Sequence, residues 1–194
     1  MHNDAQDTLL GNISFHDNLP VSWEPLSSLP SEGERLRYHQ TNEELLQNLL
    51  LHDEQPASQD DDDLESVSGH EHFKRLEARL DLLLSLVTEM MTADGKLPPD
   101  QAVTISAHGL RVHTLEPEAA GLDLGGTGLL KIQLYLDPQF PRPLTLFAQL
   151  LDIQPQNFTV SFSPLEDRLQ DLLDKYIFRQ RRRVIALARR GENS

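Results

Sequence analysis

The chain has 194 residues, 38% of them hydrophobic, enough for one compact domain with an appendage or for two small units. It has no cysteine, which excludes a disulfide framework, a thiolate metal site and a cysteine nucleophile. The net charge of −14 is uneven, because residues 1–100 carry 21 acidic and 6 basic side chains, whereas residues 101–194 carry 10 and 11.

The N-terminal stretch 1–10 contains Asp4 and Asp7 and lacks a basic start followed by an apolar run, so we expect no secretory signal. No apolar stretch approaches the roughly 20 residues that a membrane helix needs. We therefore expect a cytoplasmic protein with no membrane insertion. Nucleic acid is not an expected partner, because the acidic half of the chain would repel its phosphates.

In chain order, residues 13–23 have the composition of one or two short extended segments, with a turn at Asp17-Asn18. Further on, Thr41 is followed three positions later by Glu44, which is the spacing of a capping box and predicts the start of a helix. Four leucines would give this helix an apolar face: Leu45, Leu46, Leu49 and Leu50.

An acidic linker at 52–69 follows this helix and contains the run Asp60-Asp61-Asp62-Asp63. Such a composition buries too little apolar surface to offset the entropy of ordering the chain, so we expect the linker to be solvated. A calcium site is the less favoured interpretation, because the run lacks the loop glycine and the terminal glutamate of an EF-hand.

A second helix is expected at 70–92, and its apolar residues alternate steps of three and four. The residues of this heptad seam are Phe73, Leu76, Leu80, Leu83, Val87 and Met90, with Leu84 beside them. The spacing predicts a coiled coil, and the width of the seam favours three or four chains, a tetramer above all. The alternative is that this face packs on the chain's own helix at 45–50 or on its β domain.

Strand-like sequence follows at 102–115, 128–136, 144–153 and 158–162, with glycine and proline in the turns between. Several short strands at this spacing predict an antiparallel barrel or sandwich.

A last helix is expected to start with Ser163 as its N-cap, Pro164 in its first turn and Glu166 in a capping box, and to end near Arg189. Its first half has an apolar row. Its second half is basic and contains Arg179, Arg181, Arg182, Arg183, Arg189 and Arg190.

Other candidate chemistry is sparse. His108 and His113 have opposite strand parity and no third ligand spaced with them, so we interpret them as surface or turn residues. The glycine-rich stretch 125–128 precedes a strand instead of a helix, which favours a hairpin turn over a phosphate loop. We identify no catalytic residue and no metal ligand, and we expect no enzymatic activity.

The order of elements and four segments together resemble the PilZ domain family. The segments are Asn18–Val21, Thr104–Val112, Leu134–Pro138 and Tyr176–Arg181. The resemblance covers 10–25 and 100–190, with a helical insertion at 39–94. It implies a six-stranded antiparallel PilZ-like β-barrel with a C-terminal helix and an inserted coiled-coil helix. The heptad insertion indicates an atypical, oligomeric member, as in xanthomonad-type bacteria.

PilZ domains that bind cyclic di-GMP have an R-x-x-x-R pair before the first strand and a D/N-x-S-x-x-G turn after it. Carried onto this chain, the resemblance implies a degenerate nucleotide motif, consisting of Thr104, Ser106, Gly109 and Arg111. Thr104 replaces the acidic or amide residue, and residues 1–12 contain no arginine. Arg75 and Arg79 spell R-x-x-x-R, but they fall within the heptad helix, and we interpret them as surface charges.

The function that the resemblance implies is that of a signalling or adaptor protein in the bacterial cyclic di-GMP network, which regulates motility, pilus assembly or virulence. It would act by homo-oligomerisation and by contact with an unidentified protein partner, and we expect no cofactor. The alternative is a true cyclic di-GMP receptor whose pocket is completed by arginines from the insertion or from another subunit.

Overall fold

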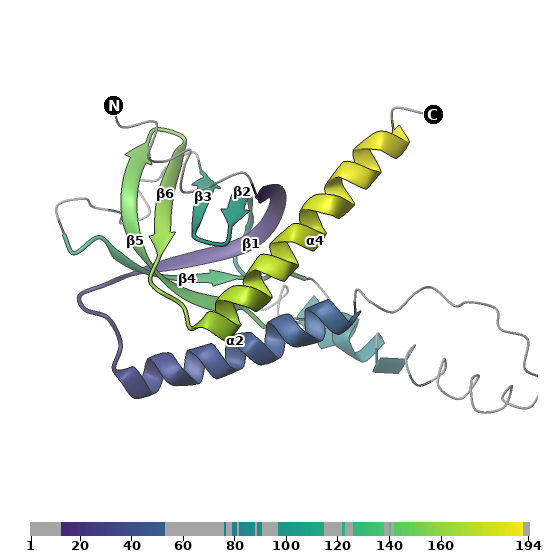
Figure 1. Cartoon of the computed structure of the whole chain (residues 1–194), viewed down its shortest axis with the longest axis horizontal. Helices are drawn as coiled ribbons and strands as arrows, with labels where there is room; N and C mark the ends of the chain where they lie inside the picture. Colours follow the sequence, from purple (N-terminus) through teal and green to yellow (C-terminus); the bar gives the residue numbers. More distant parts are fainter. Residues whose placement is uncertain are drawn as a thin grey trace, which may run out of the picture.

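The computed structural model describes residues 13–52, 97–114, 126–137 and 142–191, together with positions 76, 79–80, 82–87, 89–90, 122 and 140. Six strands close into a barrel in the order β1-β2-β3-β6-β5-β4, and every neighbouring pair is antiparallel (Figure 1). The strands are β1 (Ser14–Leu26), β2 (Asp100–Ser106), β3 (Gly109–His113), β4 (Leu129–Leu134), β5 (Leu144–Gln154) and β6 (Asn157–Phe162). The expected fold class is confirmed.

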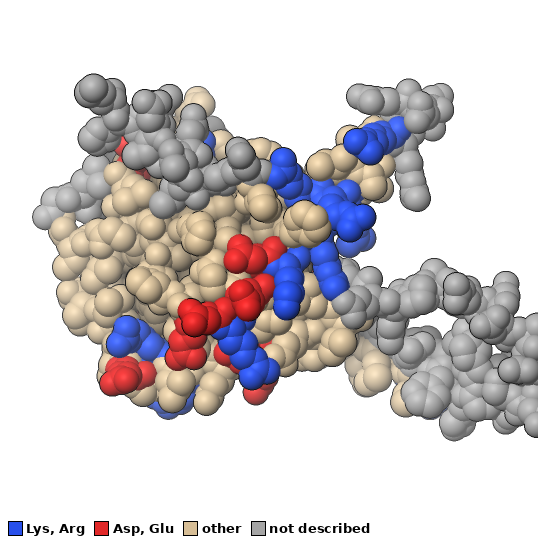
Figure 2. All heavy atoms as spheres, viewed as in Figure 1, with Lys and Arg blue, Asp and Glu red and all other residues tan. Residues whose placement is uncertain are grey.

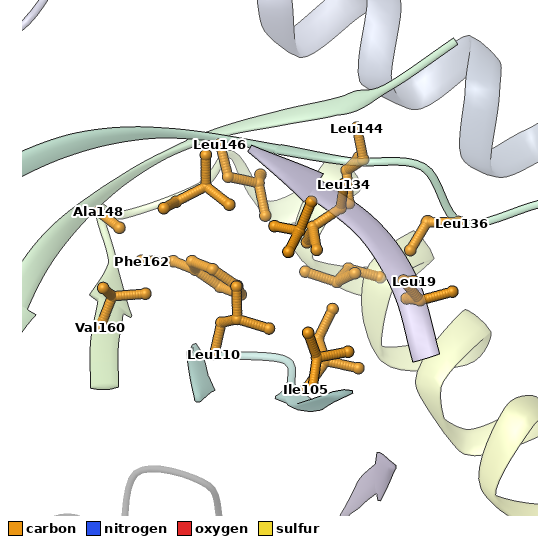
Figure 3. Packing of buried hydrophobic residues seen from close by; sticks show 14 of the residues in the cluster. Leu19, Ile105, Leu110, Leu134, Leu136, Leu144, Leu146, Ala148, Val160 and Phe162 are labelled. Atoms are coloured by element: carbon orange, nitrogen blue, oxygen red, sulfur yellow. The ribbon is translucent and has the colours of Figure 1, made fainter. Parts of the chain in front are cut away.

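The barrel core consists of alternate residues of each strand, because successive side chains of a strand point to opposite faces. Figure 3 shows Leu110, Leu134, Leu146 and Phe162 meeting there from four different strands, and all four are buried. Burial of each such side chain contributes about 1.5–3 kcal/mol. The core therefore fixes the positions of β2 and β3, the two strands that the short turn connects.

Strand β1 is longer than expected and changes partner along its length. Residues 14–20 pair with β2 and residues 21–26 pair with β4, so the predicted turn at Asp17-Asn18 is wrong. Pro20, which has no N–H to donate, stands where one partner gives way to the other. Because β1 pairs with both β2 and β4, it closes the barrel.

Helix α2 spans Glu32–His52. The predicted helix start at the capping box of Thr41 and Glu44 is therefore wrong, because both residues lie inside the helix. The box lies at Ser31 and Glu34 instead: the Ser31 N–H and hydroxyl donate to Glu34 Oε2 at 3.1 and 2.7 Å. The Glu34 N–H donates to Ser31 Oγ at 3.4 Å. The four leucines at 45–50 are buried against the barrel and the last helix.

Helix α4 (Asp167–Gly191) packs on α2 and on β1 (Figure 1). Its predicted start at Ser163 is wrong, because the helix begins at Asp167. The Ser163 N–H donates to Phe147 O at 2.7 Å and so extends the pairing with β5. The first hydrogen bond of the helix is the one that the Gln170 N–H donates to Glu166 O at 2.9 Å.

The glycine-rich stretch before β4 does not close a hairpin, which corrects the interpretation of 125–128. Strand β3 pairs with β2 and β6, whereas β4 pairs with β1 and β5, so the connection between them crosses to another part of the barrel. Gly128 has a φ of +63°, and a Cβ there would lie 2.5 Å from Gln149 Nε2. The left-handed φ favours glycine at this position, and a side chain here would also displace the tip of Gln149.

Candidate functional site

The β2–β3 turn is held by the hydroxyl of Ser106. Ser106 Oγ accepts from the N–H groups of His108 and Gly109 at 3.2 and 3.1 Å, and it donates to Gly109 O at 3.2 Å. Ser106 is only 2% exposed. The structure thus brings Ser106 and Gly109 together as the motif predicts, and it uses the hydroxyl to shape the turn.

A row of polar residues crosses four neighbouring strands beside this turn. The register pairs His16 with Thr104, Thr104 with Arg111, and Arg111 with Thr159. Thr104 Oγ1 lies 2.7 Å from His16 Nδ1, and Arg111 Nε donates to Thr159 Oγ1 at 3.2 Å. Arg111 is the one lysine or arginine in these four strands. A doubly charged phosphodiester ligand would therefore find one arginine here, already bonded to a neighbour.

The R-x-x-x-R pattern of the insertion is placed only in part. Arg75 lies outside the described residues, and Arg79 is an exposed residue in a helical conformation. The two histidines considered as ligands, His108 and His113, are both exposed. No group of three potential metal ligands gathers among the described residues.

The heptad seam lies on a helical segment whose described positions run from 76 to 90. In a single chain its apolar side chains face solvent, with exposures from 45% for Val87 to 66% for Met90. Leu76, Leu80 and Leu83 are 51–58% exposed, Leu84 is half-buried, and Phe73 lies outside the described residues.

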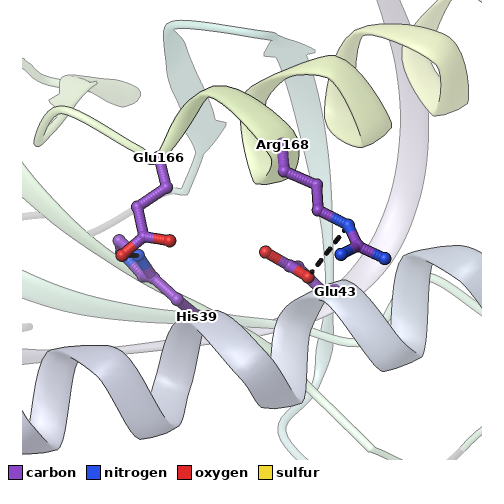
Figure 4. Close-up of polar contacts among 4 residues, drawn as sticks. All are labelled: His39, Glu43, Glu166 and Arg168. Carbon is purple, nitrogen blue, oxygen red and sulfur yellow. Dashed lines mark ion pairs between the residues drawn. The ribbon is translucent and has the colours of Figure 1, made fainter.

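The α2–α4 contact brings together residues that sequence reasoning missed. His39 Nδ1 lies 3.4 Å from Glu166 Oε1 without a hydrogen bond, and Arg168 Nε lies 3.3 Å from Glu43 Oε2 (Figure 4). His39 and Glu43 are one turn apart on α2, which is the only signal that the sequence offers. Their partners are set by the packing of the two helices.

A pocket of about 150 Å³ lies beside His39, where α2 meets β5 and the chain that follows β6. Its polar lining consists of Arg35, His39, Thr145 and Ser163. Small-molecule sites usually measure about 300–1,000 Å³, so this pocket is too small for a dinucleotide.

A closed six-stranded antiparallel barrel with a T-x-S-x-x-G turn between β2 and β3 and a helix after its last strand defines a PilZ-type domain. The family model described as "Atypical PilZ domain, cyclic di-GMP receptor" matches residues 46–190. The chain therefore belongs to the atypical PilZ family, a family of receptor domains, and the resemblance seen in the sequence is confirmed.

Among solved structures, a pathogenic protein of Xanthomonas campestris is 25% identical, with a TM-score of 0.68, over 95% of this chain and 98% of its own. It is described as a tetrameric PilZ domain self-assembled via a helical bundle. The inhibitor of motility MotI/DgrA of Bacillus subtilis is 22% identical, with a TM-score of 0.33, over 42% of this chain and 41% of its own.

A search of curated proteins finds no match to this sequence. No helix in the described part of the chain is long and apolar enough to cross a membrane.

Proposed function

We infer that this protein is a homo-oligomeric signalling adaptor of the bacterial cyclic di-GMP network. The observation that carries the inference is the exposed apolar row on residues 76–90. A row of apolar side chains that remain about half exposed along the described part of a helix is typical of an interface. Complete burial of a fully exposed large side chain contributes about 1.5–3 kcal/mol. These residues are already about half-buried, and association costs translational and rotational freedom, so the whole row is needed for a stable assembly.

The proposed assembly is a tetramer built on helices 70–92. Leu84 and Leu86 lie beside the heptad positions and widen the seam beyond the strip that two helices bury. The similar Xanthomonas protein, whose description names a tetramer and a helical bundle, supports this number. The two parts of the barrel, 10–25 and 100–190, would then be carried on the outside of the bundle.

The nucleotide motif is proposed to be degenerate. Thr104 is 5% exposed and bonded to His16, so it presents no carboxylate or amide to a guanine edge. Arg111 donates to Thr159, and the first twelve residues contribute no arginine. A phosphate clamp of the family type needs a pair of arginine forks, and the four strands around this turn offer Arg111 alone. The output would therefore pass through protein contacts, in the cytoplasm, to an unidentified partner in motility, pilus or virulence regulation, and without enzymatic activity.

A second candidate function is that of a cyclic di-GMP receptor, because the family description names that ligand. The intact turn at Ser106 and Gly109 supports it as well. In this case Arg75 and Arg79, from the same chain or from another subunit, would complete the pocket.

Calorimetric titration of the full-length protein with cyclic di-GMP at near-physiological salt separates the two functions. The adaptor is expected to give no heat and no change in the anisotropy of a fluorescent cyclic di-GMP. Binding at micromolar affinity or tighter would favour the receptor. In that case Arg111→Ala and Arg75→Ala/Arg79→Ala should weaken binding at least tenfold, and Arg37→Ala on the exposed side of α2 should not.

A further inference from the structure

The second half of α4 forms a surface that combines arginine with exposed apolar side chains. Residues 178–190, the basic face, contain six arginines and no acidic residue. Figure 2 shows basic side chains gathered where α4 leaves the barrel. The exposed apolar residues are Phe178, Val184, Ile185 and Leu187, at 41–59% exposure. We propose that the basic face binds the acidic segment 53–69 of the same chain.

The apolar part of the basic face continues the side of α4 that packs on the barrel. Ile177 is fully buried, and Val184 follows it by seven residues, which is two helical turns on the same side. Val184 is nevertheless 46% exposed. On another side of the helix, Arg182 Cζ lies 5.9 Å from the centre of the Phe178 ring, a cation–π arrangement that holds a guanidinium over an apolar surface.

The C-terminal end of α2, from which the acidic segment continues, lies against α4 beside the basic face. Arg179 Nη1 donates to Leu50 O at 2.8 Å, so the last turn of α2 abuts α4 at the first arginine of the basic run. The acidic segment begins directly after His52, where α2 ends. Asp60 follows eight residues later, and a chain of that length can span at most roughly 26 Å. From Arg179 to Arg190 the helix is only about 17 Å long, so the tether reaches every arginine.

The two partners are chemically complementary. The acidic segment carries seven carboxylates and no lysine or arginine, and it includes the apolar residues Leu64 and Val67. Arginine binds carboxylate through two parallel hydrogen bonds, and exposed Val184 and Leu187 offer contacts for the two apolar side chains. Because the segment is tethered, its effective concentration is of millimolar order, so a weak contact is sufficient.

Other anions are poorer candidates for this surface. A nucleic acid or an anionic membrane would meet the same arginines, but the net charge of −14 opposes the approach of either. The acidic segment of a second copy has the same chemistry, and the experiment separates it from the segment of the same chain.

Pulsed electron paramagnetic resonance of the full-length chain tests the proposal. The chain has no cysteine, so Ser58→Cys/Ala186→Cys accepts exactly two spin labels, one on the acidic segment and one on the basic face. Labelled chains are refolded with a tenfold excess of unlabelled ones, so that only distances within one chain are recorded. We expect a defined distance peak at 0.1 M NaCl whose width at least doubles at 1 M NaCl, because salt screens the contact.

A matched pair of charge variants completes the test. Replacing all four residues at 60–63 by Asn in the labelled chain should remove the peak. The control removes the same four charges from the barrel, through Asp17→Asn, Glu24→Gln, Asp100→Asn and Asp152→Asn, and should keep it. A peak that is unchanged by salt or by the 60–63 variant would overturn the proposal. So would a peak that appears only without unlabelled chains, which would assign the contact to a second copy.

Discussion

The side chain of Asn42, in the middle of α2, bonds to both backbone groups of Thr145 on β5. Asn42 Oδ1 accepts from the Thr145 N–H at 3.0 Å, and Asn42 Nδ2 donates to Thr145 O at 2.6 Å. Strand β6 pairs with β5 only from Ala148 onward, so the amide takes the place of a neighbouring strand. Asn42 is fully buried. This contact fastens the helix to the barrel.

Replacement of Asn42 by Ala is expected to lower the free energy of unfolding by about 2–4 kcal/mol, because two buried backbone groups would lose their partners. Denaturant unfolding at a fixed protomer concentration measures this, since assembly makes stability depend on concentration. Asn48→Ala, on the exposed side of the same helix, is the control and should change stability by less than about 0.5 kcal/mol. Equal effects of the two variants would contradict the role of Asn42.

The start of α2 is expected to depend on pH. Hydrogen bonds from the Ser31 hydroxyl and N–H lower the pKa of Glu34 below its ordinary value of 4.5. A carboxyl whose folded pKa is lowered contributes stability above its unfolded pKa and loses it as the pH falls through the folded value. The Cα chemical shifts of residues 32–35 should therefore lose helical character below about pH 4.5. In Glu34→Gln this pH dependence should be absent.

Two glycines should respond in opposite directions to alanine. Gly128→Ala is expected to cost about 1–2 kcal/mol, because a left-handed φ is unfavourable for an L side chain and its Cβ would press on Gln149. Gly33 has open space around its Cβ position and lies in the first turn of α2, so Gly33→Ala should stabilise by up to about 1 kcal/mol. Thermal unfolding of the pair checks this, and two shifts of the same sign would refute it.

The turn at Ser106 should be sensitive to loss of its hydroxyl. Ser106→Ala is expected to cost about 1–3 kcal/mol, because the N–H groups of His108 and Gly109 lose their acceptor. Ser28→Ala, at an exposed position after β1, is the comparison in the same unfolding experiment. If both variants unfold as the wild type does, the hydroxyl does not hold the turn.

Much of the barrel was predictable, because the pattern of apolar residues within each strand segment predicts a strand by itself. The apolar alternation of Leu130, Ile132 and Leu134 is visible without any neighbour. The exceptions have physical causes. Asp17-Asn18 has turn composition, yet it pairs across β2 as part of β1. Ser31 and Glu34 also have the spacing of a capping box, but Gly33 between them is a weak helix former, so the sequence alone favours the later box at Thr41 and Glu44.

The candidate site was predictable only where it is local in sequence. The Ser106–Gly109 turn closes within four residues, so its motif shows it directly. In contrast, the contacts of Asn42 with Thr145 and of His39 with Glu166 depend on how α2 lies on the barrel and on α4. No spacing within one element encodes such contacts. The oligomer seam and the division into 10–25, 39–94 and 100–190 remain predictions.

Light scattering after size exclusion tests the central claim, that residues 76–90 assemble the protein. The wild type is expected to have four times the 22.0 kDa mass of one chain. Leu80→Asp/Leu83→Asp should give monomers with unchanged strand circular dichroism, because carboxylates cannot be buried in the seam. The control Leu36→Asp/Leu51→Asp, at exposed positions of α2, should remain tetrameric. A monomeric wild type, or a seam variant that keeps the wild-type mass, would contradict the account.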